Sequence, residues 1–199
     1  DEWDISSTYW ENAAQGGLVM AVQQRMQRAV LRRSRTIIAT TAASTARLAE
    51  RAREAGSAAT AHCIYNGWDA QDLAVAATVA PATPRIPGRI RLVYTGTLWN
   101  LTSIAPLISA IEQLVTGAPH LRDRLELVVV GRKTPEQQAL LTPLASLGVM
   151  LADIPYCDHA VALATMRSSD ALLLLLSDLP GAERVAPAKV FEYLAVQRP

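Results

Sequence analysis

Charged side chains gather near the end of this sequence, in a chain that is otherwise largely apolar and rich in alanine. Residues 182–195 read AERVAPAKVFEYLA and contain Glu183, Lys189 and Glu192. Pro187 begins a helical pattern, and the free N–H groups and dipole of a helix's first turn attract phosphate. The residue types in this stretch therefore suit an anionic, phosphate-bearing ligand.

Two earlier loops carry residues that suit the same kind of ligand. Gly96 ends an apolar run in YTGT, where a glycine permits close approach of the backbone to a ligand. Gly131 is followed by two cations, Arg132 and Lys133. In an open parallel sheet, ligands bind in the crevice beyond the carboxyl ends of the strands. If these runs are strands of one such sheet, the three loops meet there, and together they favour a phosphate-bearing ligand.

The elements that would position these loops alternate between strand and helix patterns. The predicted strands lie at 90–94, 125–130, 149–152 and 171–176, and the predicted helices at 104–115, 134–147, 158–166 and 187–196. The strands are solid apolar runs rather than alternating ones, which is typical of strands buried on both faces. The sequence therefore predicts an α/β fold, with a Rossmann-like parallel sheet and helices on both faces.

The first third of the chain shows a shorter pattern of the same kind. Apolar residues at helical spacing predict a helix over 18–30, and a strand at 36–40, a helix capped by Thr41 or Ser44 and a strand at 61–65 follow. The other face of the first helix carries Arg25, Arg28, Arg32 and Arg33. This face is either a solvated surface or one attracted to anionic lipid headgroups. Farther on, three prolines without periodicity predict a linker at 76–88.

Composition and missing motifs exclude several classes of protein. A net charge of +1 over 199 residues argues against a dedicated nucleic-acid binder. The histidines and cysteines have no metal-ligand spacing, so no metal site is expected. The longest apolar run, at 171–176, is too short to span a bilayer. The sequence also lacks G-x-G-x-x-G, the P-loop motif and G-x-S-x-G, which argues against a dinucleotide enzyme, a P-loop NTPase and an α/β-hydrolase.

Four stretches occur in the order found in one known family. They are IYNGWD at 64–69, LVYTGTL at 92–98, LELVVVGR at 125–132 and APAKVFEYLAVQRP at 186–199. Together they resemble the second half of a nucleotide-sugar glycosyltransferase of the GT-B fold, close to the group described as glycosyltransferase family 4 or group 1. The P-x-K-[VL]-F-E-Y-L-A pattern is the most specific of the four.

This resemblance implies two Rossmann-like domains that face each other across a cleft. The N-terminal domain would bind the acceptor and the C-terminal domain the nucleotide-sugar donor. Residues 1–65 resemble the tail of the acceptor-side domain, and residues 66–199 resemble the donor-binding domain, truncated at its C-terminus. We therefore expect a fragment that is inactive alone, and its catalytic residues are expected in the missing N-terminal part.

The family's pair of glutamates can be placed near the end of the chain. Glu192 matches the second glutamate, which accepts hydrogen bonds from the ribose hydroxyls, because one carboxylate can accept from both hydroxyls of a vicinal diol. Glu183 matches the first, which contacts the donor sugar, although eight residues separate the two instead of the usual seven. Lys189 lies three positions before Glu192, where the two side chains can orient each other. A surface ion pair is the alternative.

The family's diphosphate clamp is missing from its usual place. The resemblance implies an arginine and a lysine after the glycine of the first strand, but this loop reads TGTLWNLTSI. We expect Arg132 or Lys133 to bind the diphosphate instead, or Thr97 together with backbone N–H groups next to Gly96. Recognition of the base is expected from main-chain groups at Ile154.

The resemblance implies transfer of a hexose from a UDP or GDP donor to an acceptor hydroxyl, with retention and without a metal or cofactor. No D-x-D occurs, in agreement with a metal-independent site. The acceptor would be a glycan, a lipid-linked or a small molecule, and a bacterial cell-envelope polysaccharide fits. The expected location is the cytoplasm or the inner face of the membrane. Two alternatives stay open: a nucleotide-sugar epimerase of the same fold, and a non-catalytic GT-B partner or binding module, which the missing clamp favours.

Overall fold

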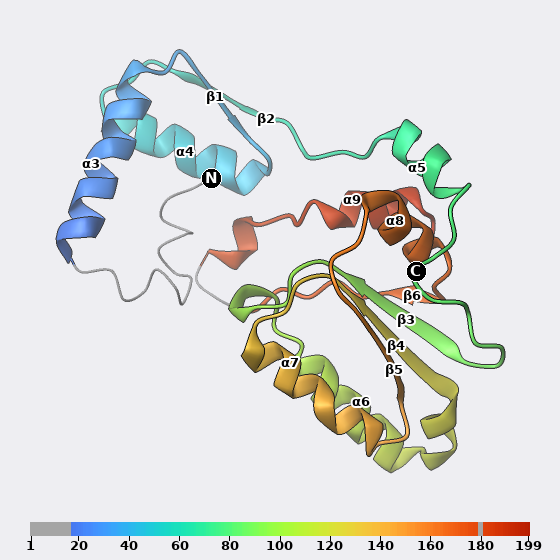
Figure 1. Ribbon diagram of the computed structural model, residues 1–199. Coiled ribbons are helices and arrows are strands. Elements are labelled where there is room, and N and C mark those ends of the chain that lie inside the picture. The colour runs from blue at the N-terminus through green and yellow to red at the C-terminus, as the bar shows by residue number, and fades with distance from the viewer. Residues whose placement is uncertain (1–16, 179–180) are drawn as a thin grey trace. The chain divides into compact units, whose positions relative to one another are not determined.

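The structure, a computed structural model, describes residues 17–178 and 181–199 (Figure 1). The described chain forms two compact units. The first comprises residues 17–66 with 177–178 and 181–187, and the second comprises residues 67–176 with 188–199. That these units are the acceptor-side and donor-binding domains of a longer protein stays a prediction.

The second unit is built on a four-stranded parallel sheet with the strand order β5-β4-β3-β6. Its strands are β3 (Ile90–Thr95), β4 (Leu125–Val130), β5 (Met150–Ile154) and β6 (Ala171–Leu172). Thr95 pairs with Val130, and Val130 pairs with Ile154, so the carboxyl ends of the three longer strands are level. The predicted parallel sheet is confirmed, and the loops that follow these strands leave from one edge.

Helices cover both faces of this sheet (Figure 1). They are α5 (Ala70–Ala76), α6 (Ala105–Gly117), α7 (Pro135–Leu141), α8 (His159–Arg167) and α9 (Lys189–Ala195). Leu127 and Val129 of β4 pack in one buried cluster with residues of α6 and α7. Val128 and Val130 point to the opposite face, on the side of α8 and α9. All six residues of β4 are buried, and five of them are apolar, as expected for a strand covered on both faces; the sixth is Glu126.

The first unit has its own small parallel sheet. Its elements are α3 (Gly17–Arg33), β1 (Thr36–Ala39), α4 (Ala42–Glu54) and β2 (Thr60–Cys63), with β1 and β2 paired in parallel. Leu31, Ile37 and Ala52 form the centre of its core. Thr41 is the N-cap of α4, because its hydroxyl accepts a hydrogen bond from the Ser44 N–H at 3.1 Å. The sequence-based choice of cap is therefore settled in favour of Thr41.

The prediction of a linker at 76–88 was wrong, because this segment is packed inside the second unit. Arg85 forms a bidentate ion pair with Asp170, at 2.6 and 2.7 Å. The Thr83 carbonyl accepts a hydrogen bond from the buried guanidinium of Arg91 at 3.1 Å. The segment lacks periodicity because polar contacts, rather than an apolar face, hold it in place.

Several element boundaries differ from the prediction. Helix α7 ends at Leu141 instead of residue 147, because Pro143 removes a backbone donor and a 3-10 turn follows. Strand β6 ends at Leu172 instead of residue 176. Helix α9 begins at Lys189, two residues after the proline expected to start it. The short helix α5 was not predicted; Asp69 caps it by accepting a hydrogen bond from the backbone of Gln71.

None of the helices in the described ranges has the length and apolarity that a bilayer crossing needs.

A buried ion pair joins the neighbouring strands β3 and β4 near their N-terminal ends. The Arg91 side chain is 0% exposed and that of Glu126 is 1% exposed. Arg91 donates two hydrogen bonds of 2.8 Å to the Glu126 carboxylate, one from Nε and one from Nη2. The same guanidinium also donates to Ser168 Oγ and to the carbonyls of Thr83 and Pro84. It therefore joins two strands, the proline-rich segment and the end of α8 through one charged group.

Removing one partner of this pair should destabilise the chain strongly. We expect Glu126→Ala to lower the free energy of unfolding by about 3–5 kcal/mol, because it leaves the buried Arg91 charge uncompensated. Urea denaturation followed by circular dichroism measures this loss. The control is Glu50→Ala, which breaks the exposed pair Arg47–Glu50 and should cost less than about 1 kcal/mol. Equal losses in the two variants would contradict the role given to Arg91.

Candidate functional site

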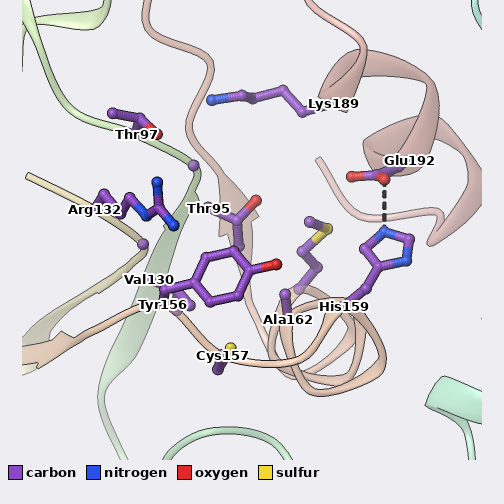
Figure 2. Close-up of a pocket in the computed structure, with 13 residues that line it drawn as sticks. Thr95, Thr97, Val130, Arg132, Tyr156, Cys157, His159, Ala162, Lys189 and Glu192 are labelled. Atoms are coloured by element: carbon purple, nitrogen blue, oxygen red, sulfur yellow. Dashed lines mark hydrogen bonds and ion pairs between the residues drawn. The ribbon is translucent and has the colours of Figure 1, made fainter.

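A cavity of about 250 Å³ opens beyond the carboxyl ends of β3 and β4 in the second unit (Figure 2). Its walls come from the loops after β3, β4 and β5 and from α8 and α9. The residues that line it are Thr95, Gly96, Thr97, Val130, Gly131, Arg132, Tyr156, Cys157, His159, Ala162, Met166, Lys189 and Glu192. Of the predicted binding residues, Gly96, Thr97, Arg132, Lys189 and Glu192 are among them. The fold thus brings together residues from both halves of this unit's sequence.

Two glycines form the floor of the cavity, and both need to be glycine. Gly96 and Gly131 have φ values of 130° and 128°, a region that side-chain-bearing residues rarely adopt. A Cβ on Gly131 would collide with the carbonyl of Gly96, and a Cβ on Gly96 would lie 2.6 Å from Lys189 Nζ. The close approach of these two loops leaves backbone, rather than side chains, facing the cavity.

Lys189 places a partly buried cation directly above Gly96. Its Nζ donates a hydrogen bond of 2.9 Å to the Tyr94 hydroxyl and lies 4.2 Å from the centre of the Tyr94 ring. Neither contact neutralises the ammonium charge. Burial lowers the pKa of Lys189 from 10.5 to about 8, although the nearby Glu192 carboxylate acts in the opposite direction. An anionic ligand next to Lys189 would stabilise the charged ammonium and so offset the cost of its burial.

Tyr94 connects this lysine to the loop after β3. Its hydroxyl donates a hydrogen bond of 3.0 Å to the Thr97 carbonyl, which also accepts one of 2.6 Å from Thr102 Oγ1. Burial raises the pKa of Tyr94 to about 12, so the phenol stays protonated at neutral pH. Lys189, Tyr94 and Thr97 therefore form one chain of contacts along the cavity wall.

Arg132, in the loop after β4, supplies a second cation to the cavity lining (Figure 2). Its guanidinium lies 5.5 Å from the centre of the Tyr156 ring, within the range of a cation–π contact. Tyr156 is 72% exposed, so this pair is accessible at the surface.

Glu192 faces the same cavity from α9 and is bound to a histidine. Glu192 Oε1 accepts a hydrogen bond of 2.8 Å from His159 Nε2 (Figure 2). The side chain of Glu192 is 26% exposed, and its second oxygen, Oε2, is not used in this contact. A carboxylate with one oxygen anchored can still accept hydrogen bonds from a ligand.

Lys133, which the sequence offered as a diphosphate cation, does not line the cavity. Its side chain is 5% exposed and its Nζ forms an ion pair of 2.8 Å with Asp153. Nζ also donates to the carbonyls of Gly131 and Ile154, at 2.8 and 3.1 Å. Burial alone would raise the pKa of Asp153, but hydrogen bonds from Lys133 and Gln138 outweigh it, and that pKa is lowered. Lys133 therefore holds the ends of β4 and β5 together.

Ile154, the residue expected to recognise the base, also lies outside the cavity lining. Its carbonyl accepts hydrogen bonds from the Gly131 N–H, at 3.1 Å, and from Lys133 Nζ. Because these donors occupy the carbonyl, it is a poor partner for a ligand. Tyr156, two residues farther along the same loop, lines the cavity instead.

Glu183 belongs to the first unit rather than to the unit that holds the cavity. It lies in a 3-10 turn, Ala182–Arg184, and its side chain is 72% exposed. This turn is attached to α4, because Thr41 Oγ1 donates a hydrogen bond of 2.8 Å to the Arg184 carbonyl. Glu183 and Glu192 are thus on different units, and the role of Glu183 stays a prediction.

Comparison with known proteins gives matches in structure rather than in sequence. No protein-family model matches this sequence, and no curated protein matches it significantly. A UDP-forming α,α-trehalose-phosphate synthase from Burkholderia xenovorans aligns with a TM-score of 0.60 at 14% identity, over 93% of this chain and 49% of its own length. HepE from Anabaena, crystallised in complex with UDP, aligns with a TM-score of 0.56 at 17% identity, over 89% and 47%.

A third match is WaaG, a glycosyltransferase involved in lipopolysaccharide biosynthesis. It aligns with a TM-score of 0.54 at 15% identity, over 94% of this chain and 51% of its own length. All three neighbours are GT-B glycosyltransferases. This chain has the fold of part of a GT-B structure. It spans about half the length of the GT-B structures that it matches.

Some residues of this site, in the cavity lining or directly beneath it, were missed from the sequence. Tyr94 was taken only as part of an apolar strand, and His159 as the start of a helix. Cys157 also lines the cavity; burial, and then the Asp158 carboxylate, raise the pKa of its thiol. His159 and Cys157 could have been proposed, because they follow the loop after β5, at the edge where ligands bind. Tyr94 could not, because its contacts come from α9, far along the chain.

The lowered pKa of Lys189 predicts a pH-dependent effect on stability. Unfolding restores the ordinary pKa of 10.5, so between about pH 8 and 10.5 the unfolded state binds more protons than the folded state. Wild-type stability should therefore rise with pH relative to Lys189→Met. We expect a relative gain on the order of 2 kcal/mol, after discounting the full shift for solvent screening. Urea denaturation of both proteins at pH 7.5 and 10.5 measures it, and a constant difference would contradict the burial of this charge.

Proposed function

We propose that this chain binds the nucleoside diphosphate of a nucleotide-sugar donor, as the donor-side part of a glycosyltransferase. The observation that carries the proposal is the cavity at the ends of β3 and β4. It combines a glycine floor, two cations, Lys189 and Arg132, and a half-anchored carboxylate, Glu192. The crystallised UDP complex of the neighbour HepE supports a nucleotide ligand for this fold.

In this proposal, the diphosphate lies over Gly96 and Gly131. Lys189 Nζ, directly above Gly96, contacts one phosphate, and Arg132 approaches from the other side. The Thr97 hydroxyl and the backbone at this edge complete the set. These groups replace the arginine and lysine that are missing from the loop after β3. Arginine and lysine suit phosphate because both stay charged when it binds.

The rest of the nucleotide follows from the remaining lining residues. Glu192 accepts hydrogen bonds from the two ribose hydroxyls, since a carboxylate matches a vicinal diol. The base lies toward Tyr156, whose ring is largely exposed and offers a stacking surface. Arg132 on the same ring keeps a positive charge between base and phosphate.

The reaction we propose is the transfer of a hexose to an acceptor hydroxyl. The bond between the sugar C1 and the terminal phosphate oxygen breaks, a bond from C1 to the acceptor oxygen forms, and the hydroxyl proton passes to a base. Lys189 and Arg132 stabilise the negative charge that develops on the leaving diphosphate. We propose retention of configuration, on the sequence resemblance, with these protein cations supplying the charge that a metal supplies elsewhere. The acceptor-side groups lie outside this cavity.

We also propose an acceptor of the cell-envelope class and a cytoplasmic site of action, with the chain at times bound to the inner face of the membrane. The neighbour WaaG, which acts in lipopolysaccharide biosynthesis, supports the acceptor class. Helix α3 supports membrane contact, because it exposes Leu18, Val22 and Met26 and carries exposed arginines. Such a pattern suits an interface with anionic lipids.

Binding of a nucleoside diphosphate tests the main proposal. Isothermal titration calorimetry at pH 7 should show binding of UDP or GDP by the wild-type chain. Glu192→Ala and Lys189→Met should each weaken it by about tenfold or more, since each removes a hydrogen bond or ion pair to a charged group. The affinity of the wild type should also fall above about pH 8, where Lys189 loses its proton.

The matched control for this experiment is Glu112→Ala, an exposed glutamate on α6 and therefore on the other face of the sheet. It should bind the nucleotide as the wild type does. Failure of both UDP and GDP to bind the wild type would overturn the proposal. With a longer, acceptor-competent protein, release of free sugar or of an epimer without any acceptor would favour the epimerase alternative.

Membrane contact is tested by sedimentation with vesicles of phosphatidylglycerol and phosphatidylcholine. The wild type should sediment with the anionic vesicles at low salt and be released at high salt, because screening weakens the attraction. Arg25→Glu with Arg28→Glu should abolish sedimentation. If this double variant sediments like the wild type, the arginine face is simply a solvated surface.

A further inference from the structure

Three polar side chains from three different helices meet beside the cavity. His159 of α8 lies between Glu192 of α9 and Asp72 of α5 (Figure 2 shows the first two). His159 Nε2 lies 2.8 Å from Glu192 Oε1, and His159 Nδ1 lies 3.5 Å from Asp72 Oδ2. No sequence motif joins these three positions, and the family resemblance gives a role only to Glu192.

The arrangement is set by the apolar core beneath it. Leu73, Leu163 and Tyr193 belong to one cluster that packs α5, α8 and α9 together. Leu73 and Tyr193 directly follow Asp72 and Glu192, and Leu163 lies one helical turn after His159. Packing of these side chains fixes the three helices in register. The core therefore keeps the three polar side chains within contact distance of one another.

Hydrogen-bonding capacity shows how the histidine acts on the glutamate. A carboxylate only accepts hydrogen bonds, so His159 Nε2 must carry the proton that it shares with Glu192 Oε1. Asp72 Oδ2 lies 3.5 Å from the second ring nitrogen, Nδ1, and this longer contact favours the ring orientation in which Nε2 points at Glu192. Glu192 has three rotatable side-chain bonds, and this contact selects one direction for its carboxylate. Oε2 is left for a ligand.

We propose that His159, oriented by Asp72, is a positioning residue that holds the Glu192 carboxylate for the two ribose hydroxyls of the donor nucleotide. This inference rests on the proposed function, because it assumes that Glu192 binds ribose. His159 and Asp72 are about half exposed, at 52% and 50%, so their ion pairs add little to folding stability. Variants of either residue should fold normally, and the effect of the pair is on recognition.

The experiment compares the binding of UDP and 2′-deoxy-UDP. The two ligands differ only in the 2′-hydroxyl, so their affinity ratio reports on recognition of the ribose hydroxyls. By calorimetry at pH 7, the wild-type chain should prefer UDP by about tenfold, the value of one hydrogen bond to a charged group. His159→Leu should reduce this preference to about threefold or less, chiefly by weakening UDP. Its affinity for 2′-deoxy-UDP should stay within about twofold of the wild type. This ligand lacks one of the two hydroxyls that Glu192 would bind, so misplacing the carboxylate costs it less.

Conservative variants separate the two roles within the proposal. The amide nitrogen of His159→Gln can take the place of Nε2, so this variant should keep most of the preference for UDP. Asp72→Ala should lower the preference less than His159→Leu does, since it removes only the group that orients the ring. In the double variant with His159→Gln, loss of Asp72 should have no further effect. His120→Gln, an exposed histidine before β4 at the opposite end of the sheet, is the control.

The outcomes distinguish this inference from the proposed function. If His159→Leu leaves the preference at the wild-type value, or weakens both ligands equally, His159 does not position the carboxylate. If Glu192→Ala leaves UDP binding unchanged, or if the wild type binds no UDP, Glu192 does not bind the ribose. Both the proposed function and this inference are then wrong. Loss of the preference in His159→Leu with retention in His159→Gln supports it.

Discussion

The carbonyl of Gly96 occupies the space in which a side chain of residue 131 would begin. This contact brings the backbone of two neighbouring loops together at the ends of β3 and β4, and both residues have φ values that favour glycine. The pairing of the strands even continues past the glycines, where the Leu98 N–H donates to the Arg132 carbonyl. A larger residue at 131 would separate the loops, and with them the wall that carries Arg132 and the floor beneath Lys189.

The two lysines of the sequence show how the fold divides its charges between structure and binding. Lys133 turns inward, meets Asp153 and joins β4 to β5. Lys189 comes from the far end of the chain and donates a hydrogen bond to the Tyr94 phenol across the cavity wall. The buried Arg91–Glu126 pair joins β3 and β4 at the end of the sheet opposite the cavity. Rigid strands thus position a cation whose own charge is incompletely satisfied, as a binding site requires.

The sheet was predictable because buried parallel strands have largely apolar sequences. The rule that ligands bind beyond the carboxyl ends of such strands then located the candidate site. Gly96, Thr97, Arg132, Lys189 and Glu192 follow from this rule or from the family resemblance. The inward turn of Lys133 did not follow, because a sequence does not show which of two adjacent cations meets Asp153. The partners of Lys189 and Glu192 were equally hidden, because Tyr94 and His159 are brought to them only by packing of α9. The proline-rich segment was misread because its order comes from distant polar groups.

Helix α9 is only seven residues long, and it carries both Lys189 and Glu192. In the family pattern, phosphate and ribose are held by separate parts of the chain, so either contact can change without the other. Here the two side chains share one short rigid body, anchored through the Tyr193 hydroxyl to the Leu173 carbonyl at 3.0 Å. A shift of this helix would alter both contacts together. In the proposed function, the phosphate contact of Lys189 and the ribose contact of Glu192 would therefore be gained or lost together.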